Sequence, residues 1–189
     1  MSYFPIYLNL EGKEILIVGG GNIALEKLQK LLPFTKNITI IAKEVKYDIY
    51  ILIKENCLTY YQRPYHEGDI DRFDIVVVAT DDINLQKSIF LESRGKHILV
   101  NSVDNIKYCD FIFPSIIKRE NLTITISTNG ASPAFSKELR LFLENLLPSS
   151  IDDFLSKLKE LRDKLPKGKE RMQHFEKMVK SYFKENIKP

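Results

Sequence analysis

The chain has 189 residues, of which 44% are hydrophobic and 28% are charged, and its formal net charge is +3. This composition is typical of a globular protein, and no apolar run reaches the roughly 18 residues that cross a membrane. Two cysteines make no disulfide framework, and the first residues do not read as a secretory signal, so we expect a cytoplasmic protein. The positive excess lies after residue 150, where basic and acidic residues interleave, which argues against nucleic-acid binding.

Strands and helices alternate in the first part of the chain. Short runs rich in β-branched residues predict strands at Ile15–Val18, Ile38–Ala42, Leu58–Gln62, Ile75–Ala79 and Ile98–Val103. Helical patterns follow the first and fourth of these runs, at Ala24–Leu32 and Asn84–Ser93. Several of the strands are unalternated, as in a sheet that is covered on both faces. We therefore predict an α/β domain with a parallel sheet and right-handed crossovers.

The pattern changes in the second part of the chain. The runs Phe111–Ile117 and Leu122–Ser127 predict two strands of a hairpin. Ser132 and Pro133 predict the start of a helix, as N-cap and first helical residue, and Pro148 its end. Ser150 and Asp153 resemble a capping box at the start of another helix. A last helix carries the apolar positions Met172, Phe175, Val179, Tyr182 and Phe183.

A glycine-rich turn joins the first predicted strand to the first helix. Gly19, Gly21 and Ala24 fit the pattern G-x-G-x-x-A in the correct context. The first glycine permits a tight turn, the second lets a pyrophosphate approach the backbone, and Ala24 keeps the helix close to the sheet. The free N–H groups of the helix would face the anion. This predicts a dinucleotide site, although a glycine turn can also serve only to pack a helix on a sheet.

The second strand ends in the residues that distinguish the two nicotinamide cofactors. An acidic residue at this place usually binds the ribose hydroxyls of NAD, and Glu44 is suitably placed. The neighbouring Lys43 could instead face the 2′-phosphate of NADP. We expect NAD, with NADP as the alternative.

Polar residues also follow the later strands, where the carboxyl ends of a parallel sheet form a ligand crevice. Thr80, Asp81 and Asp82 follow one strand and are expected near the cofactor, while one of the two aspartates caps the next helix. Asn101 and Asp104 lie at the end of the next strand. A carboxylate here can be a general base, or only a turn residue that binds its own backbone.

The segment Ser127–Pro133 is polar and opens a helix that carries Lys137 and Arg140. Such a segment can present N–H groups and hydroxyls to an anion, although from the residues alone ordinary N-capping is the better explanation. No metal site is expected, because the three histidines are far apart in sequence and no Cys/His pair has ligand spacing.

Five ordered motifs together identify a resemblance. They are FPIYLNLEGKEILIVGGGNIALEK, VVVATDD, ILVNSVD, CDFIFPSII and ITISTNGASPAFSKELR. From about Phe4 to Leu147 the chain resembles the siroheme synthase family of precorrin-2 dehydrogenases with sirohydrochlorin ferrochelatase activity. The departures are Lys43 in a frequent Pro-Glu pair, Ser102 in place of an aliphatic residue and Asn129 in place of a glycine.

The resemblance implies an NAD-binding Rossmann domain over residues 1–112, a dimerisation region over 113–147 and a helical region over 148–189. It implies a homodimer that oxidises precorrin-2 to sirohydrochlorin with NAD, and that then inserts ferrous iron to give siroheme. The alternatives are a dehydrogenase whose iron step belongs to a separate chelatase, and a non-catalytic module that senses NAD. The fused methyltransferase domain of some members is absent from this sequence.

The resemblance also assigns roles to individual residues. It makes Asp104 the catalytic residue, which takes a proton as hydride leaves for the nicotinamide. The family's cofactor contacts fall on Gly21, Asn22, Ile23, Lys43 and Glu44. The strand ends and the glycine turn add the cofactor candidates Gly19, Gly20, Ala79, Thr80, Asp81, Asn101 and Val103. The tetrapyrrole is expected at Ser127, Thr128, Asn129, Lys137 and Arg140.

Overall fold

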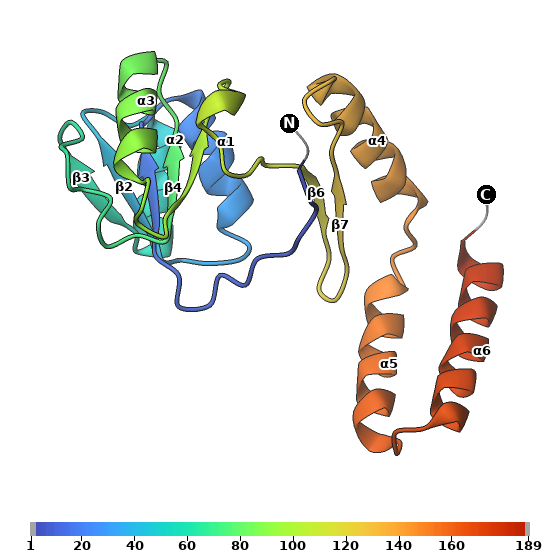
Figure 1. Cartoon of the computed structure of the whole chain (residues 1–189). Coiled ribbons are helices and arrows are strands. Elements are labelled where there is room, and N and C mark those ends of the chain that lie inside the picture. The colour runs from blue at the N-terminus through green and yellow to red at the C-terminus, as the bar shows by residue number, and fades with distance from the viewer. Residues whose placement is uncertain (1–2, 188–189) are drawn as a thin grey trace. The chain divides into compact units, whose positions relative to one another are not determined.

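The structure is a computed structural model that describes residues 3–187. The chain forms two compact units, the first over Tyr3–Ile112 and the second from Phe113 onward (Figure 1). The first contains a parallel sheet with its helices, and the second a hairpin followed by three helices.

A five-stranded parallel sheet forms the centre of the first unit. Its strands are β1 (Ile15–Val18), β2 (Ile38–Ala42), β3 (Thr59–Gln62), β4 (Ile75–Val78) and β5 (Leu99–Ser102). Their order is β3-β2-β1-β4-β5, and every neighbouring pair is parallel. The α/β class and the parallel sheet that the sequence predicts are therefore confirmed.

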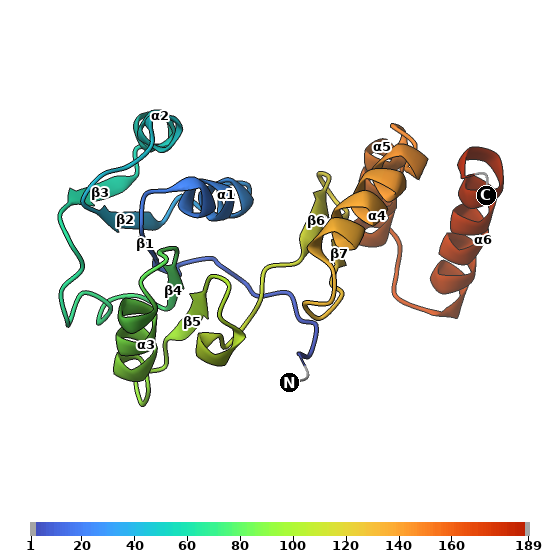
Figure 2. The same ribbon diagram turned by 90° about the horizontal axis from the view of Figure 1, so that it is seen from above.

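Helices cover both faces of this sheet. α1 (Asn22–Leu31) and α2 (Tyr47–Asn56) lie on one face, and α3 (Ile83–Glu92) lies on the other (Figure 2). A 3₁₀ turn, η1 (Ile106–Tyr108), follows β5. Every residue of β1, β2 and β4 is buried, which explains why these strands are apolar throughout except for Thr39 of β2. The edge strand β3 is mostly exposed.

The second unit begins with an antiparallel hairpin of β6 (Ser115–Lys118) and β7 (Thr123–Ile126). Three helices follow, namely α4 (Pro133–Leu146), α5 (Ile151–Lys164) and α6 (Lys169–Asn186). The rings of Phe154 and Tyr182 stack between α5 and α6 with centroids 4.0 Å apart. As the sequence predicts, the Ser132 hydroxyl caps α4 by accepting from Phe135 N–H, and Pro133 is its first residue.

Two sequence predictions need correction, and one helix, α2, was not predicted. The first hairpin strand begins at Ser115 and not at Phe111, because the Phe111 carbonyl binds the Asn101 side chain of the first unit's β5 and Pro114 has no N–H to donate. Ser150 does not cap α5 with its side chain, since its hydroxyl bonds the Tyr182 hydroxyl (2.9 Å).

Candidate cofactor and catalytic site

The predicted cofactor residues of the first unit gather at the carboxyl edge of its sheet. Gly19 N–H donates to Ile41 O (2.9 Å), and Ala79 N–H donates to Val18 O (2.8 Å). Val103 extends the pairing of β5 with β4 in the same way. The segments that follow β1, β4 and β5 therefore start side by side, as the crevice of a parallel α/β sheet requires.

The three glycines of the turn meet different surroundings. Gly19 has φ +124°, and a Cβ there would lie 2.1 Å from Ala79 O. A Cβ on Gly20 would lie 2.0 Å from Glu44 O. Packing alone therefore excludes side chains at these two positions. At Gly21 the backbone is extended, with φ −87°, and a Cβ would meet nothing within 4 Å. The packing of the fold would therefore allow a side chain at Gly21. A glycine is needed here only if a pyrophosphate approaches the backbone closely.

Gly21 is the N-cap of α1, and no side chain caps this helix end. The first N–H groups of α1 thus remain for an anion, with the helix dipole in their favour. Lys46 N–H donates to Gly20 O (2.9 Å), and its ammonium donates to Asn22 Oδ1. The sequence motif missed Lys46, which adds a positive charge beside the helix end, because the fold brings it there from the loop after β2.

Lys43 and Glu44 are both exposed where β2 ends. The Glu44 carbonyl packs against Gly20, so this loop lies directly beside the glycine turn. The two residues that bear on cofactor choice therefore stand at the place where an adenosine ribose binds in this type of fold.

In the turn after β4, one aspartate caps the next helix and the other does not. Asp82 Oδ1 accepts from Asn84 N–H (2.9 Å) and Leu85 N–H (3.1 Å), so Asp82 is the N-cap of α3. Thr80 Oγ1 accepts from Asp82 N–H (3.3 Å), while Asp81 is exposed and has no capping role. Of the two aspartates, Asp81 is the one that remains available to a ligand.

A buried side chain of α3 links two of the turns at this edge. Gln86 Nε2 donates to Thr80 O (2.7 Å) and to Val103 O (3.2 Å). The carbonyls after β4 and after β5 are thus held by one amide group. The sequence offered no signal for Gln86, because its role depends on two carbonyls from other elements.

Asp104 is exposed in the turn that follows β5 and has a left-handed backbone, with φ 58°. This conformation costs a residue other than glycine roughly 1 kcal/mol, and aspartate tolerates it better than most. Asn101 is buried, and its side-chain Nδ2 donates to Phe111 O (2.8 Å). Asn101 therefore fixes the end of β5, and Asp104 presents a carboxylate at the edge that carries the glycine turn.

The predicted tetrapyrrole residues belong to the second unit. Thr128 Oγ1 accepts from Ser132 N–H (3.0 Å), and Ser127 Oγ accepts from Asn129 N–H (3.1 Å). Asn129 has φ 52°, a left-handed conformation that a glycine would also adopt. These contacts shape the turn before α4, so its hydroxyls serve the turn itself in this structure.

Two basic residues lie on α4 beyond this turn. Arg140 Nη1 donates to Glu144 Oε2 (2.6 Å), which pairs its charge within the helix, and Lys137 is exposed. The cofactor candidates and Asp104 lie at one edge of the sheet of the first unit, and the tetrapyrrole candidates belong to the second unit.

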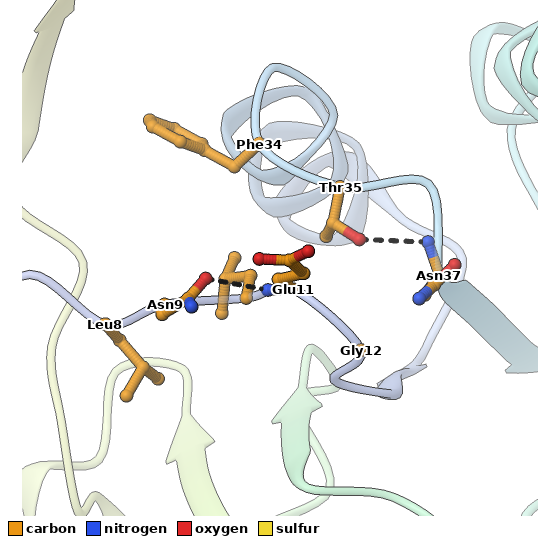
Figure 3. Close-up of a pocket in the computed structure, with 8 residues that line it drawn as sticks. Leu8, Asn9, Glu11, Gly12, Phe34, Thr35 and Asn37 are labelled. Atoms are coloured by element: carbon orange, nitrogen blue, oxygen red, sulfur yellow. Dashed lines mark hydrogen bonds between the residues drawn. The ribbon is translucent and has the colours of Figure 1, made fainter.

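A pocket of about 390 Å³ lies elsewhere on the first unit (Figure 3). Its lining residues are Leu8, Asn9, Leu10, Glu11, Gly12, Phe34, Thr35 and Asn37. These residues precede β1 and β2, at the amino ends of the strands. The pocket is therefore at the edge opposite to the cofactor residues and is not the dinucleotide crevice.

Over residues 3–187, no group of three or more His, Cys, Asp and Glu side chains could hold a metal ion. None of the helices in that range is both long and apolar enough to span a membrane.

Comparisons with known proteins agree with this arrangement. A family model described as "Putative NAD(P)-binding" matches residues 6–115, and one described as "Sirohaem biosynthesis protein central" matches residues 119–146. A solved structure described as "SirC, precorrin-2 dehydrogenase" superposes with a TM-score of 0.78 at 27% identity, over 91% of this chain and 86% of that chain.

Siroheme synthases are among the similar curated proteins. Those of Acinetobacter baylyi and Buchnera aphidicola are 38% and 32% identical, over 78% and 99% of this chain. That of Neisseria meningitidis is 33% identical over 100% of it. The chain spans only 33%, 40% and 40% of the lengths of these three relatives. A nicotinamide-binding unit followed by the sirohaem central region places this chain in the siroheme synthase family.

Proposed function

We propose that this protein oxidises precorrin-2 to sirohydrochlorin with NAD as the hydride acceptor. The observation that carries the proposal is the placement of Asp104, an exposed carboxylate on the same sheet edge as the glycine turn. The likeness to a solved precorrin-2 dehydrogenase over most of both chains supports the choice of substrate. The siroheme synthase relatives support the same pathway.

The glycine turn would bind the cofactor. Gly21 leaves room for the pyrophosphate, and the uncapped N–H groups of α1 would donate to its oxygens. Glu44 would accept hydrogen bonds from the ribose hydroxyls, which favours NAD over NADP. The ammonium of Lys46, already held by Asn22, would add a favourable charge beside the phosphates. When bound, the nicotinamide supplies the acceptor for a hydride.

Asp104 would act as the general base. Oxidation of precorrin-2 removes two hydrogens, one as a hydride and the other as a proton, and the carboxylate takes the proton. The bond from Asn101 Nδ2 to Phe111 O holds the end of β5, directly before the turn that carries Asp104. General-base catalysis of this kind contributes about 100-fold or more to a rate.

The same carboxylate would serve a second step, the insertion of ferrous iron into sirohydrochlorin. This step replaces two protons on pyrrole nitrogens by the metal ion, and Asp104 would accept a proton from one of them. Iron is a substrate here and would be held by the nitrogens of the macrocycle.

The turn before α4 would bind the carboxylates of the tetrapyrrole. Thr128 lies at the start of this helix, and Lys137 and Arg140 lie along it. The Arg140–Glu144 pair would have to open for its guanidinium to bind a substrate carboxylate.

We also propose that two copies associate through the central region. Phe135 and Phe142 of α4 are 60% and 63% exposed, so this helix presents two large aromatic side chains that no part of the described chain covers. Association would remove them from water. Sedimentation should give a dimer for the parent protein and a monomer for Phe142→Glu, whereas a monomeric parent at micromolar concentration excludes the dimer.

The direct test is anaerobic incubation of the purified protein with precorrin-2 and NAD, followed by absorbance. Conversion to sirohydrochlorin that depends on both protein and NAD is the expected result. Ferrous iron is then added, and siroheme should form faster than in a control without protein. A matched reaction with NADP measures the preference that Glu44 implies.

Two other results of this incubation would change the proposed function. Conversion without faster iron insertion would limit the protein to the dehydrogenase step and leave the metal to another chelatase. Measurable NAD binding with no turnover of precorrin-2 would exclude the proposed activity and favour an NAD-sensing module.

A further inference from the structure

The thiol of Cys109 lies against the turn that carries Asp104. Its Sγ accepts from Ser102 N–H (3.2 Å) and lies within hydrogen-bonding distance of Ser102 O (3.0 Å) and Asn105 O (3.3 Å). The single S–H proton can be donated to either of these two carbonyls. One side chain thus contacts both ends of the turn Ser102–Asn105.

This turn needs such support because its own hydrogen bond is weak. Asn105 N–H reaches Ser102 O only at 3.4 Å, which is beyond the usual range for N–H···O bonds. Within the turn, Asp104 adopts the left-handed conformation that most residues avoid. The exposed Asp104 carboxylate therefore depends on contacts from outside the turn for its position.

The segment that carries Cys109 is itself firmly attached to β5. Asp110 N–H donates to Val100 O (2.7 Å), and the Asp110 carboxylate accepts from Val100 N–H (2.8 Å). Arg94 donates to both oxygens of that carboxylate, at 2.9 and 2.7 Å. These bonds hold the segment whether or not residue 109 has a thiol. A change at Cys109 would thus act on the turn and leave the segment in place.

The surroundings of the thiol favour its protonated form. Burial raises the pKa of Cys109 and the Asp110 carboxylate also raises it, whereas the hydrogen bond from Ser102 N–H lowers it, and the net shift is upward. A protonated thiol donates a hydrogen bond, whereas a thiolate would repel the two carbonyls that face it. The other cysteine, Cys57, is exposed and follows α2, remote in the fold from β5, which makes it a matched control.

We propose that Cys109 is a positioning residue for Asp104: its S–H group holds the left-handed turn so that the carboxylate stays in place for proton transfer. This inference rests on the proposed role of Asp104 as the base. It makes Cys109 part of the reaction although the thiol itself touches no reacting atom.

The test compares Cys109→Ala, Cys109→Ser and Cys57→Ser with the parent enzyme. Cys109→Ala should lower kcat for precorrin-2 oxidation by about 10-fold or more, because small displacements of a catalytic group have effects of this size. The KM for precorrin-2 and the affinity for NAD should stay near the parent values. Cys109→Ser should restore most of kcat, since a hydroxyl can donate to the same carbonyls.

A cysteine that only fills space would behave differently. Alanine would then preserve kcat, and serine would gain nothing over alanine. Equal kcat values for the parent and both Cys109 variants would overturn the proposal. So would an equal loss in Cys57→Ser, because that would be an effect of removing any thiol.

A second measurement does not depend on activity. Amide hydrogen exchange in peptides that cover residues 102–105 should be faster in Cys109→Ala than in the parent, and close to the parent in Cys109→Ser. Unchanged exchange in Cys109→Ala would overturn the positioning role even if the enzyme is active. If exchange is faster in Cys109→Ala as expected, but the parent does not oxidise precorrin-2, the proposed function is refuted. The structural role of the thiol in the turn would then still hold.

Discussion

Alanine substitutions at the neighbouring Gly20 and Gly21 should affect different properties, the stability of the fold at Gly20 and the affinity for NAD at Gly21. Gly20→Ala would place a Cβ 2.0 Å from Glu44 O and 2.9 Å from Val45 Cα, both backbone atoms that cannot turn aside. Gly21→Ala would place its Cβ in open space, at a backbone conformation that alanine adopts freely. The first change therefore tests the packing of the fold, and the second tests the ligand.

The expected magnitudes follow from these surroundings. Overpacking against backbone in Gly20→Ala should lower the free energy of unfolding by about 1–3 kcal/mol or more. In Gly21→Ala, the lost flexibility of the unfolded chain and the poorer N-cap oppose each other, which leaves a net change within about 0.5 kcal/mol. A methyl group that displaces the pyrophosphate from one N–H removes a charge-assisted bond of about 1.5–3 kcal/mol. This weakens NAD binding by about 10- to 100-fold.

The assay pairs urea unfolding without cofactor with calorimetric titration of NAD. Gly21→Ala should unfold like the parent and bind NAD poorly, and Gly21→Asp should abolish binding because its carboxylate would face the phosphates. Parent-like affinity in Gly21→Ala would refute the placement of the pyrophosphate at this turn. A large loss of stability in the same variant would show that Gly21, like Gly20, is needed for packing.

Three further predictions concern single carboxylates. Asp104→Ala should bind NAD normally and lose dehydrogenase activity by about 100-fold or more, and unchanged turnover would exclude it as the base. Asp82→Ala should lower the free energy of urea unfolding by about 1 kcal/mol through loss of the α3 cap, whereas the neighbouring Asp81→Ala should not. Hydrogen bonds from Arg63 lower the pKa of Asp69, so this carboxylate stabilises the fold above its unfolded pKa of about 4, and the contribution is lost as pH falls through the folded pKa. Asp69→Asn should flatten the acid side of the stability curve, and parallel curves would contradict this.

The sequence predicts the central strands closely, because their signal is local. β1 and β2 have the predicted bounds, since a short β-branched run that is buried on both faces leaves few alternatives. The helix α2 escaped prediction for the opposite reason. Its sequence YDIYILIKEN is rich in residues with weak helix preference, no side chain caps it, and only Ile49 and Ile53 are buried. Packing against the sheet decides its conformation.

Some residues of the candidate site could likewise be predicted from local sequence, and others could not. The glycine turn and Asp104 could be found from motifs, because each lies at the end of a predicted strand. Lys46, Gln86 and Cys109 could not, because each acts through carbonyls or side chains that the fold brings from other elements. The sequence left two aspartates, Asp81 and Asp82, as candidates for the N-cap of α3. Only the hydrogen bonds of the structure identify Asp82 as the cap.

The central place of β1 governs how the first unit can form during synthesis. β1 is made first, yet its residue Ile15 pairs with Ile38 of β2 on one side and with Ile75 of β4 on the other. The apolar β1 therefore leaves the ribosome well before its second partner exists, and the β1–β4 pair forms only after the long segment that contains α1, β2, α2 and β3 has been made. During that interval β1 and β2 expose an unpaired edge. The helical hairpin of α5 and α6, whose partners are adjacent in sequence, has no such delay.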